Sequence, residues 1–508
     1  MGVVTITDRP MALDELLAIA SGSPVKLDES ARSTIAASRA VIDRVLAGDQ
    51  PIYGLNTSVG HMKDTRLPLD QLRSTQTLLI MSHAGGTGPP LPAIAVRAAM
   101  AARLNGIARG GSGASPSVAE ALVAMLNAGV HPLVPSRGSV GAADLGQLAT
   151  IGQVALGAGR AELAGEILSG GEALARAGIE PLVLEPKDGL TFMSSNAVSI
   201  GEGTIALDRA RRLAPLADTV AALSLEATRS GPSVVEPVVG EAKPFAGQIE
   251  SCAAVTAALA ESDLLQSGAA ASVQAPLSFR VIPQVHGAMR EAIDAAARAV
   301  HVELNGRGDN PLVSIEHDAM IHNGNFHPIV MAIAFDQLRI TLAHVGQLSE
   351  RRMGHLWDAF FAAGPPEPGS EPAELFGVTL RYPAAAAAAE LKRAAAPATL
   401  DVPPLDIGVE DHATNAPLAV RTTTQALDLL EEIMSIEVLL ACDVIDTMHP
   451  SPVLGSGTGA IVTRARDALA ALDEDRSPAT AQAAVATALR PSTTLRLATD
   501  TRPLPTPP

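Results

Sequence analysis

The sequence predicts an all-α protein, built as an elongated helical bundle, and two observations support this prediction. The first is composition: 47 % of the 508 residues are hydrophobic, yet they include only 8 Phe, 2 Tyr and 1 Trp. The core must therefore be built from Ala, Leu, Val and Ile, which is typical of closely packed helices rather than of a β-sandwich or propeller. The second is periodicity, because apolar residues recur at helical spacing over long segments whereas alternating strand patterns are few.

Capping residues predict where several of these helices begin and end. Ser115 is a good N-cap, and Pro116 follows at the first helical position, where its missing N–H is no loss. Gly129 and Pro132 then end the apolar run. Pro383, followed by a run of alanines, predicts the start of another helix rather than a low-complexity segment.

The longest predicted helix covers about residues 418–445, and one face of it is apolar. The residues of this stripe are Leu429, Ile433, Ile436 and Leu440. A second long segment has the same period at Leu338, Leu342 and Val345. Stripes of this length need neighbouring helices to cover them, which favours a bundle.

The sequence predicts a weak boundary near Gly189, where a loop-rich segment is followed by long helices. We expect residues 1–188 to form an N-terminal loop-and-helix part and residues 189–508 to form the long-helix bundle and the C-terminal part. The Pro-rich tail from Thr501 is expected to fray. Gly- and Pro-rich loops are expected at 107–115, 134–143 and 364–372.

Charge and cysteine content exclude several classes of function. The 54 acidic and 37 basic residues give a net charge of −17, which argues against a nucleic-acid or anionic-membrane partner. The sequence has no uninterrupted apolar run of membrane-spanning length and no signal pattern, so we expect a cytoplasmic protein. Cys252 and Cys442 are too few for a disulfide framework or a closed zinc site.

Two motifs have a plain structural interpretation. Gly455, Gly457 and Gly459 resemble a dinucleotide-binding loop but follow no predicted strand, so we interpret them as a turn beside a helix. His322 and His327 lie five residues apart in a loop, which is the wrong spacing for two ligands on one helical face. We therefore expect no metal site.

Two other features stay open on spacing alone. The sequence Glu-Asp-His at residues 410–412 is as expected for a solvated charge cluster. Tyr53 lies in a turn rich in Gly and Asn, and a buried structural phenol is as good an interpretation as a catalytic one.

Taken together and in order, seven segments carry a resemblance to a known family. They are YGLNTSVG from Tyr53, SHAGGTGPPLP from Ser82, RGSVGAADL from Arg137, LSFRVIPQVHG from Leu277, GDNPL from Gly308, NGNFH from Asn323 and EDH from Glu410. Between about residues 40 and 450 the chain resembles the aromatic amino acid lyases, histidine ammonia-lyase most closely. This resemblance implies an elongated all-α homotetramer whose active sites form where several subunits meet.

The chain departs from the family at the electrophile. The resemblance implies a methylidene-imidazolone made by cyclising Ala-Ser-Gly, but the matching stretch here is one residue shorter and reads Ala142, Ala143, Asp144, with no hydroxyl to eliminate. Ser139 is followed by Val140 and matches a serine that does not cyclise. The Asn-Gly-Thr that supports the electrophile is replaced by Ser-Ser-Asn at residues 194–196. We therefore expect no cofactor.

Other functional positions of the family are retained. The resemblance implies that Tyr53 takes a proton from the substrate Cβ and that Arg280 holds the substrate carboxylate with its two-pronged guanidinium. Further residues matching or flanking the family's pocket are Asn56, Asn196, Asn310 and Phe326.

The substrate-ring end of the pocket resembles imidazole-specific members. His83 with Glu410 is the pattern of those members, and Lys392 lies 18 residues before Glu410, the same separation as a family lysine. Beside Arg280, Leu277 stands where the family has a tyrosine, so the pocket wall should be more apolar. An apolar wall suits a methylated ammonium better than a primary one.

These features predict a lyase that eliminates trimethylamine from a histidine betaine without an electrophile. Ergothioneine, giving thiourocanate, is the first expected substrate and hercynine the second, as in the ergothionase branch of the family. Tyr53, Lys392 and Glu410 are the expected catalytic residues. The alternatives are an inactive homologue acting as a binding or regulatory subunit, and an isomerase, hydratase or cyclase on the same scaffold.

Overall fold

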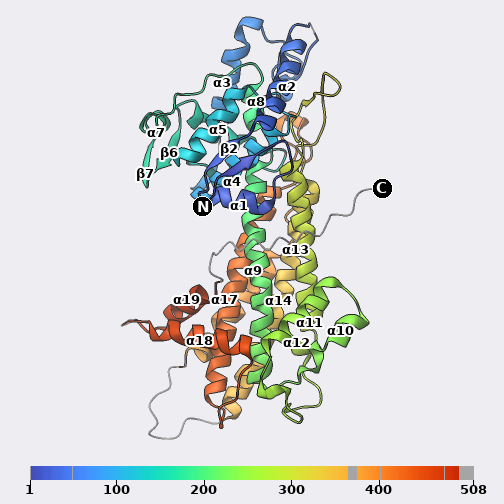
Figure 1. Ribbon diagram of the computed structural model, residues 1–508, viewed down its shortest axis with the longest axis vertical. Coiled ribbons are helices and arrows are strands. Elements are labelled where there is room, and N and C mark those ends of the chain that lie inside the picture. Colours follow the sequence, from blue (N-terminus) through green and yellow to red (C-terminus); the bar gives the residue numbers. More distant parts are fainter. Residues whose placement is uncertain (1, 49, 364–374, 401, 474, 491–508) are drawn as a thin grey trace.

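The computed structural model of the protein describes residues 2–48, 50–363, 375–400, 402–473 and 475–490. The predicted loop at 364–372 and the tail from Thr501 lie outside the described residues. The molecule is elongated, with a head of short helices and small sheets at one end and a bundle of long helices at the other (Figure 1). The prediction of an all-α, elongated bundle is confirmed.

The head is formed by the elements from β1 to α8, which are mostly short helices and short strands. Its elements are β1 (Val4–Ile6), α1 (Leu13–Ala20), β2 (Val25–Leu27), α2 (Glu29–Leu46), η1 (Gly60–Met62), η2 (Leu69–Gln71), α3 (Leu72–His83), β3 (Thr87–Pro90), α4 (Ala93–Ala108), α5 (Pro116–Ala128), β4 (His131–Pro132), β5 (Pro135–Arg137), α6 (Leu145–Ala155), β6 (Arg160–Leu163), β7 (Glu166–Ser169), α7 (Gly170–Arg176) and α8 (Asp188–Met193). The sheets are small: β1 pairs with β2 in parallel, and β3–β5 and β4–β6–β7 are antiparallel.

The remaining elements form the bundle and the loops that return to the head. They are α9 (Ala197–Ala227), η3 (Pro232–Val235), α10 (Pro237–Ala242), α11 (Ala246–Ala258), η4 (Asp263–Leu265), α12 (Leu277–Arg280), α13 (Ile282–Asn305), β8 (Leu312–Ser314), β9 (Ala319–Ile321), α14 (Ile329–Ala362), α15 (Phe376–Thr379), α16 (Arg381–Ala394), η5 (Asp406–Gly408), α17 (Ala416–Asp446), α18 (Ser456–Ala470) and α19 (Pro478–Leu489). The antiparallel pair β8–β9 lies against α2 of the head.

Local sequence explains the helix boundaries. Helix α5 begins with Pro116 after Ser115 and ends at Gly129, whose φ of 72° is the left-handed conformation that glycine adopts without strain. Helix α17 covers the predicted 418–445 segment, and α16 begins just before Pro383. Gly455 is the N-cap of α18, so the glycine motif there opens a helix.

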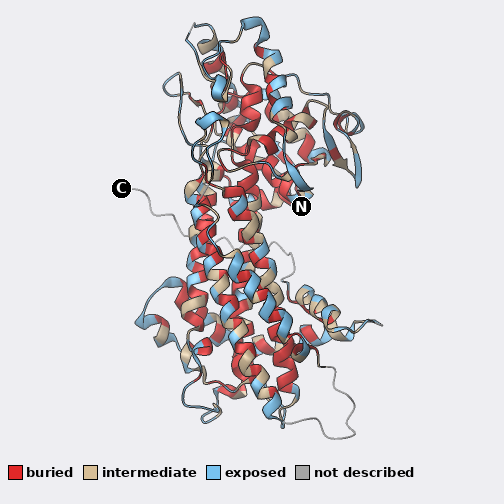
Figure 2. Ribbon diagram, turned by 180° about the vertical axis from the view of Figure 1, so that it is seen from behind, coloured by how far each residue is buried: buried red, intermediate tan, exposed pale blue. Residues whose placement is uncertain are grey.

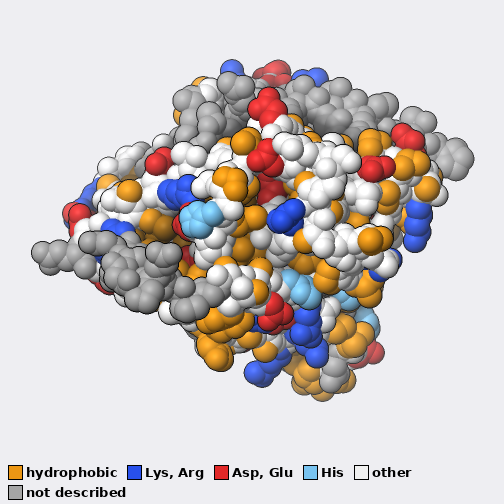
Figure 3. Space-filling view, turned by 90° about the horizontal axis from the view of Figure 1, so that it is seen from below, with side chains coloured by type: hydrophobic (Ala, Val, Ile, Leu, Met, Phe, Trp, Pro, Cys, Tyr) orange, Lys and Arg blue, Asp and Glu red, His pale blue; other side chains and the backbone are white. Residues whose placement is uncertain are grey.

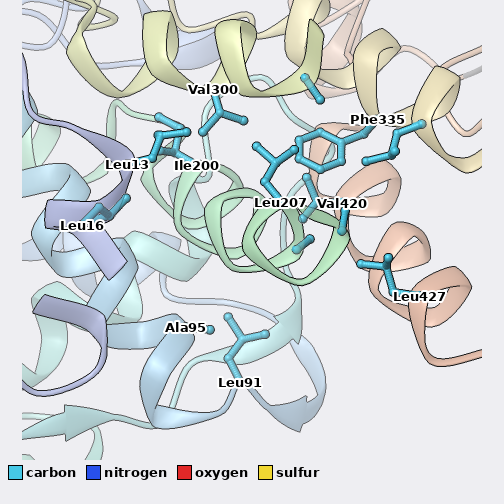
Figure 4. Packing of buried hydrophobic residues seen from close by; sticks show 14 of the residues in the cluster. Leu13, Leu16, Leu91, Ala95, Ile200, Leu207, Val300, Phe335, Val420 and Leu427 are labelled. Carbon is cyan, nitrogen blue, oxygen red and sulfur yellow. The ribbon is translucent and has the colours of Figure 1, made fainter. Parts of the chain in front are cut away.

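The long helices α9, α13, α14 and α17 pack around one apolar core that continues into the head (Figure 2). Figure 4 shows Leu207 of α9, Val300 of α13, Phe335 of α14 and Val420 of α17 meeting in this core. Aliphatic side chains dominate it, as the composition predicts. Gly189 itself lies in α8, within the head. Helix α9 joins the head to the bundle, and it packs so closely on α4 that a Cβ at Gly201 would lie 2.8 Å from the backbone N of Ala99.

Helix α14 is the one described helix with the length and apolar composition to cross a membrane. Its most apolar 18-residue window is 56 % buried within the fold, and it packs against α13 and α17. Leu338, Leu342 and Val345 are all fully buried. The apolar character of α14 is therefore that of a core helix of the bundle.

Candidate active site

A cavity of about 390 Å³ gathers seven of the residues predicted for the site. Its walls come from the Tyr53 segment, α3, the start of α6, α8, the loop around residues 310–326 and η5. The predicted residues that line it are Tyr53, His83, Ala142, Ala143, Asn310, Phe326 and Glu410. The lining residues that sequence reasoning did not assign to the site are Val59, Gly60, His61, Met62, Leu79, Leu145, Leu190, Met193, Ser194 and Asp406.

Tyr53 lies in a tight turn that its neighbours hold in place. Asn56 is buried; its side chain accepts a hydrogen bond from Ile52 N at 2.7 Å and donates one to Gln50 O at 2.8 Å. Asn56 does not line the cavity, so in this chain it shapes the turn behind Tyr53. The Tyr53 hydroxyl accepts a hydrogen bond from Gly60 N at 3.1 Å.

The electrostatic surroundings of Tyr53 oppose its ionisation. Burial raises the pKa of the Tyr53 phenol, and the negative charges of Glu410 and Asp406 raise it further, while the hydrogen bond from Gly60 acts in the opposite direction. The phenol is therefore a poor source of phenolate at neutral pH. A positive charge bound near these carboxylates would lower the pKa of Tyr53.

His83 and Glu410 form the second polar part of the cavity. His83 is the last residue of α3, and its Nδ1 lies 2.8 Å from Leu79 O. Because a carbonyl oxygen only accepts, Nδ1 is assigned the proton, which leaves Nε2 as an acceptor on the neutral ring. Burial raises the pKa of Glu410, as does Asp406, and attraction to His83 partly counters this.

Residues 139–144 form a loop that hydrogen bonds hold tightly in place. Ser139 Oγ donates to Ala143 O at 3.0 Å and accepts from Gly141 N at 2.9 Å. Gly141 has a φ of +84°, and a Cβ there would collide with Thr414, so only glycine fits. Ala143 also has a left-handed φ of 59°, which is strained for a residue with a side chain.

Asp144 lies behind this loop rather than in the cavity. It is fully buried at the start of α6, and its carboxylate accepts from Ser199 N at 2.9 Å and from Ser199 Oγ at 3.2 Å. Burial raises the pKa of Asp144. Asp144 therefore ties the loop to α9.

The opposite wall is built from segments linked by short polar contacts. Asn310 N donates to Ser194 Oγ at 3.2 Å, and Asn310 Oδ1 accepts from Asn323 N at 3.1 Å. Asn196 is buried outside the cavity and donates through Nδ2 to Phe326 O at 2.9 Å. Of the predicted residues in this wall, Asn310 and Phe326 face the cavity and Asn196 supports Phe326 from behind.

The structure adds His61 and Asp406, which no motif marked. Asp406 accepts from His61 N at 2.9 Å, and its other oxygen lies 2.6 Å from His61 Nδ1. The two residues are 345 positions apart in sequence, so no motif spacing could have predicted that they pair. The described residues include no cluster of three or more His, Cys, Asp or Glu side chains arranged to hold a metal ion.

With this geometry established, comparison with known proteins identifies the family. The sequence profile of the aromatic amino acid lyases matches residues 11–467. The chain belongs to the aromatic amino acid lyase family. Histidine ammonia-lyases from Gloeobacter violaceus and Stigmatella aurantiaca are 38 % and 36 % identical to it, over 92 % of this chain and over 91 % and 92 % of their own lengths.

Solved structures of family members have the same fold. Ergothionase from Treponema denticola, an ergothioneine-degrading enzyme solved with desmethyl-ergothioneine sulfonic acid, is 28 % identical with a TM-score of 0.89, covering 96 % of this chain and 98 % of that one. Histidine ammonia-lyase from Trypanosoma cruzi is 30 % identical with a TM-score of 0.84, covering 96 % and 93 %.

The loop at 142–144 does not fit the electrophile that the family resemblance implies. Cyclisation needs a serine hydroxyl to eliminate and a following amide nitrogen that is free to attack, and residues 142–144 have no hydroxyl. Ala143 N donates to Phe326 O at 3.1 Å, and Asp144 N donates to Ser195 O at 2.7 Å. Both amides are therefore engaged with neighbouring segments.

Three predicted residues lie away from the cavity in this single chain. Leu277 and Arg280 are the ends of α12, and both are exposed. The Gln274 amide, with its oxygen turned toward Arg280, accepts from the guanidinium at 2.7–3.2 Å. Lys392 is exposed and lines a separate hollow between α14 and α16, where Glu350 also lies.

Proposed function

We propose that the chain is a lyase that eliminates trimethylamine from a histidine betaine without an electrophile, with ergothioneine the first substrate and hercynine the second. The observation that carries the proposal is the charge of the cavity. Two carboxylates, Asp406 and Glu410, line it, and none of the described residues lining it is Lys or Arg. Apolar side chains such as Leu190, Met193 and Phe326 supply the remaining wall. A cavity of this kind favours a permanent, methylated cation.

The chemistry explains why such a cation replaces an electrophile. In an amino acid the Cβ proton is far less acidic than the α-ammonium, so a base strong enough for Cβ first deprotonates the nitrogen and leaves a poor leaving group. A trimethylammonium has no proton to lose and departs as neutral trimethylamine. The Cβ–H electron pair becomes the Cα=Cβ bond, and the Cα–N pair leaves with the amine, giving thiourocanate from ergothioneine.

In the proposed mechanism Tyr53 accepts the Cβ proton. His83 and Glu410 bind the ring and set its protonation state, so that charge developing at Cβ is stabilised. The bound cation offsets the two carboxylates that oppose ionisation of Tyr53.

We further propose a homotetramer in which neighbouring chains supply Arg280, Leu277 and Lys392 to each site. Arg280 would hold the substrate carboxylate by a two-pronged contact.

The exposed apolar surface near α12 supports this assembly. Several large apolar side chains between residues 238 and 277, the last of them on α12, are exposed in the single chain: Val238, Phe245, Ile249, Leu265, Val273 and Leu277. The view from the bundle end likewise shows apolar side chains spread between charged ones (Figure 3). Exposed apolar groups in this number support the proposal that another chain covers this surface.

Both the structural and the sequence relatives support the lyase class. The structural likeness to ergothionase supports release of trimethylamine, and the sequence likeness to histidine ammonia-lyases keeps ammonia release from histidine as a competing activity. The loop at 142–144 argues against ammonia release because it offers no hydroxyl from which the electrophile forms. The remaining alternatives are an inactive binding or regulatory subunit and an isomerase, hydratase or cyclase.

A substrate panel separates these functions. Purified protein is incubated with ergothioneine, hercynine and histidine, and trimethylamine, ammonia and near-ultraviolet absorbance are measured. Trimethylamine with a new conjugated product supports the proposal. Ammonia from histidine contradicts it, and binding of a betaine without turnover identifies a binding subunit.

A further inference from the structure

His61 and Asp406 line the cavity, and His61 has no role in the proposed elimination. Asp406 holds His61 twice, at the backbone N (2.9 Å) and at Nδ1 (2.6 Å). A carboxylate only accepts, so the neutral ring is assigned its proton on Nδ1, and Nε2 is an acceptor. The His61 side chain is 49 % exposed and that of Asp406 26 %, so the ring remains accessible from the cavity. This arrangement is that of a histidine oriented as a base by a carboxylate.

The contact between Asp406 and His61 depends on a strained backbone conformation at residues 406–408. Asp406, Ile407 and Gly408 have successive left-handed φ angles of 46°, 57° and 81°. A left-handed conformation costs roughly 1–2 kcal/mol for a residue with a Cβ, and such residues cluster at functional sites. The carboxylate also lies so close to Gly60 that a Cβ at that position would collide with it. The two segments are therefore fitted to each other.

The same short segment contacts the phenol. Gly60 N donates to Tyr53 Oη at 3.1 Å, and His61 is the next residue, so residues 60–61 contact Tyr53 at one point and Asp406 at another. A phenol that stays protonated accepts a proton from carbon only if it gives up its own. His83 is a poorer candidate to receive that proton, because the proposed mechanism assigns it to the substrate ring.

We propose that the His61–Asp406 pair receives the phenol proton of Tyr53 during the elimination. As Tyr53 Oη takes the Cβ proton, the hydroxyl proton moves to His61 Nε2, directly or through one water. The Cβ–H pair forms the double bond, and the Cα–N pair leaves as trimethylamine. The resulting imidazolium is stabilised by Asp406 and then loses its proton to water. This role rests on the proposed function, and it makes His61 a positioning residue that acts through Tyr53.

The kinetic test is His61→Asn, which keeps a donor near the position of Nδ1 and so can still bind Asp406, but has no Nε2. The matched control is His322→Asn, because the His322 ring meets Tyr53 edge-on at 6.4 Å. We expect His61→Asn to lower kcat by about 10²-fold with KM nearly unchanged, and His322→Asn to behave as wild type. We also expect the wild type to react more slowly in D2O and His61→Asn to lose this isotope effect. A His61→Asn variant with near-wild-type kcat and isotope effect overturns the proposal.

A second measurement needs no turnover, so failure of the proposed function does not obscure it. The chain has two tyrosines, and in a Tyr382→Phe background the ultraviolet titration of phenolate reports Tyr53 alone. In the proposal His61 Nε2 accepts from the neutral phenol, directly or through one water, so losing this acceptor in His61→Asn should lower the Tyr53 midpoint by up to about one unit. The other charged groups near this segment are the same in both proteins: Asp406, Glu410, His83, Lys63 and Asp64. Equal midpoints with and without His61 refute the coupling, whichever substrate the enzyme takes.

Discussion

Replacing Tyr53 by Phe tests the proposed base while leaving the fold intact. Among the described residues, the Tyr53 hydroxyl has one hydrogen-bond partner, Gly60 N at 3.1 Å. A hydrogen bond of this kind contributes about 1 kcal/mol to stability. Because Gly60 is only half-buried, its amide N–H can donate to a water molecule when the hydroxyl is removed. We therefore expect Tyr53→Phe to unfold within a few degrees of the wild type.

Turnover should respond far more strongly than stability. Loss of a general base lowers the rate by roughly 10²–10⁴-fold, which corresponds to about 2.7–5.5 kcal/mol of transition-state free energy. Substrate binding should survive, because Arg280 and the apolar walls do not depend on the hydroxyl. The raised pKa of Tyr53 adds a second expectation. If free phenolate were the base, kcat/KM would rise tenfold per pH unit far into the alkaline range, whereas transfer of the phenol proton to His61 gives a plateau.

The assay is trimethylamine release in a single turnover, with substrate binding measured separately. Tyr382→Phe is the matched control, since it removes the same hydroxyl from the only other tyrosine, which is 77 % exposed on α16. We expect that control to keep full activity. If Tyr53→Phe releases trimethylamine at the wild-type rate, Tyr53 is not the base. Lys392 is then the next candidate, supplied by another chain.

Three further predictions follow from the loop, the surface and the interior. Intact-mass measurement should give the full calculated mass, because residues 142–144 have no hydroxyl to eliminate; a deficit of two waters would contradict this. Sedimentation should show a homotetramer, and mixing inactive Tyr53→Phe with inactive Arg280→Met should restore activity if the two residues come from different chains; an active monomer would refute this. Lys187 is fully buried and its pKa falls to about 8, so between pH 8 and 10.5 the unfolded chain holds more protons and stability should rise with pH, by up to about 3 kcal/mol. Denaturant titration at both pH values, with Lys187→Met as control, checks this slope, which should disappear in the variant.

Much of the fold followed from local sequence, because helices depend on caps and period. Pro116 and Gly129 bound α5 as predicted, and the stripe residues Ile433, Ile436 and Leu440 are fully buried in α17. In these segments short-range and long-range preferences agree. The short strands were harder to foresee, since pairs such as β4 and β6 are held by tertiary context rather than by an alternating pattern.

Those residues of the candidate site that lie in family motifs could be predicted from the sequence. Tyr53, His83 and Glu410 meet in one cavity although they are far apart in sequence, and the family motifs pointed to all three. The motifs predict substrate binding for Asn56 and Asn196, whereas both side chains lie outside the cavity in this chain. A motif names the position of a side chain and not the direction in which it points.

The His61–Asp406 contact illustrates what sequence reasoning could not reach. It depends on two non-glycine residues, Asp406 and Ile407, in left-handed conformations that their side chains disfavour. Local propensity argues against that turn, so tertiary contacts, including the two bonds to His61, must stabilise it. Disagreement of this kind between local preference and the observed backbone is expected at functional sites.

The same two carboxylates link substrate choice to the state of the base. Asp406 and Glu410 attract a cation into the cavity, and without one they raise the pKa of Tyr53 and keep it protonated. A neutral or anionic ligand would leave their field in place, and that field opposes any negative charge that develops on the Tyr53 oxygen. In the proposed mechanism a permanent ammonium offsets that field when Tyr53 accepts a proton from carbon. If the proposed mechanism holds, we expect uncharged analogues to be rejected in kcat as well as in KM, because the charge that binds the substrate would also favour proton transfer to Tyr53.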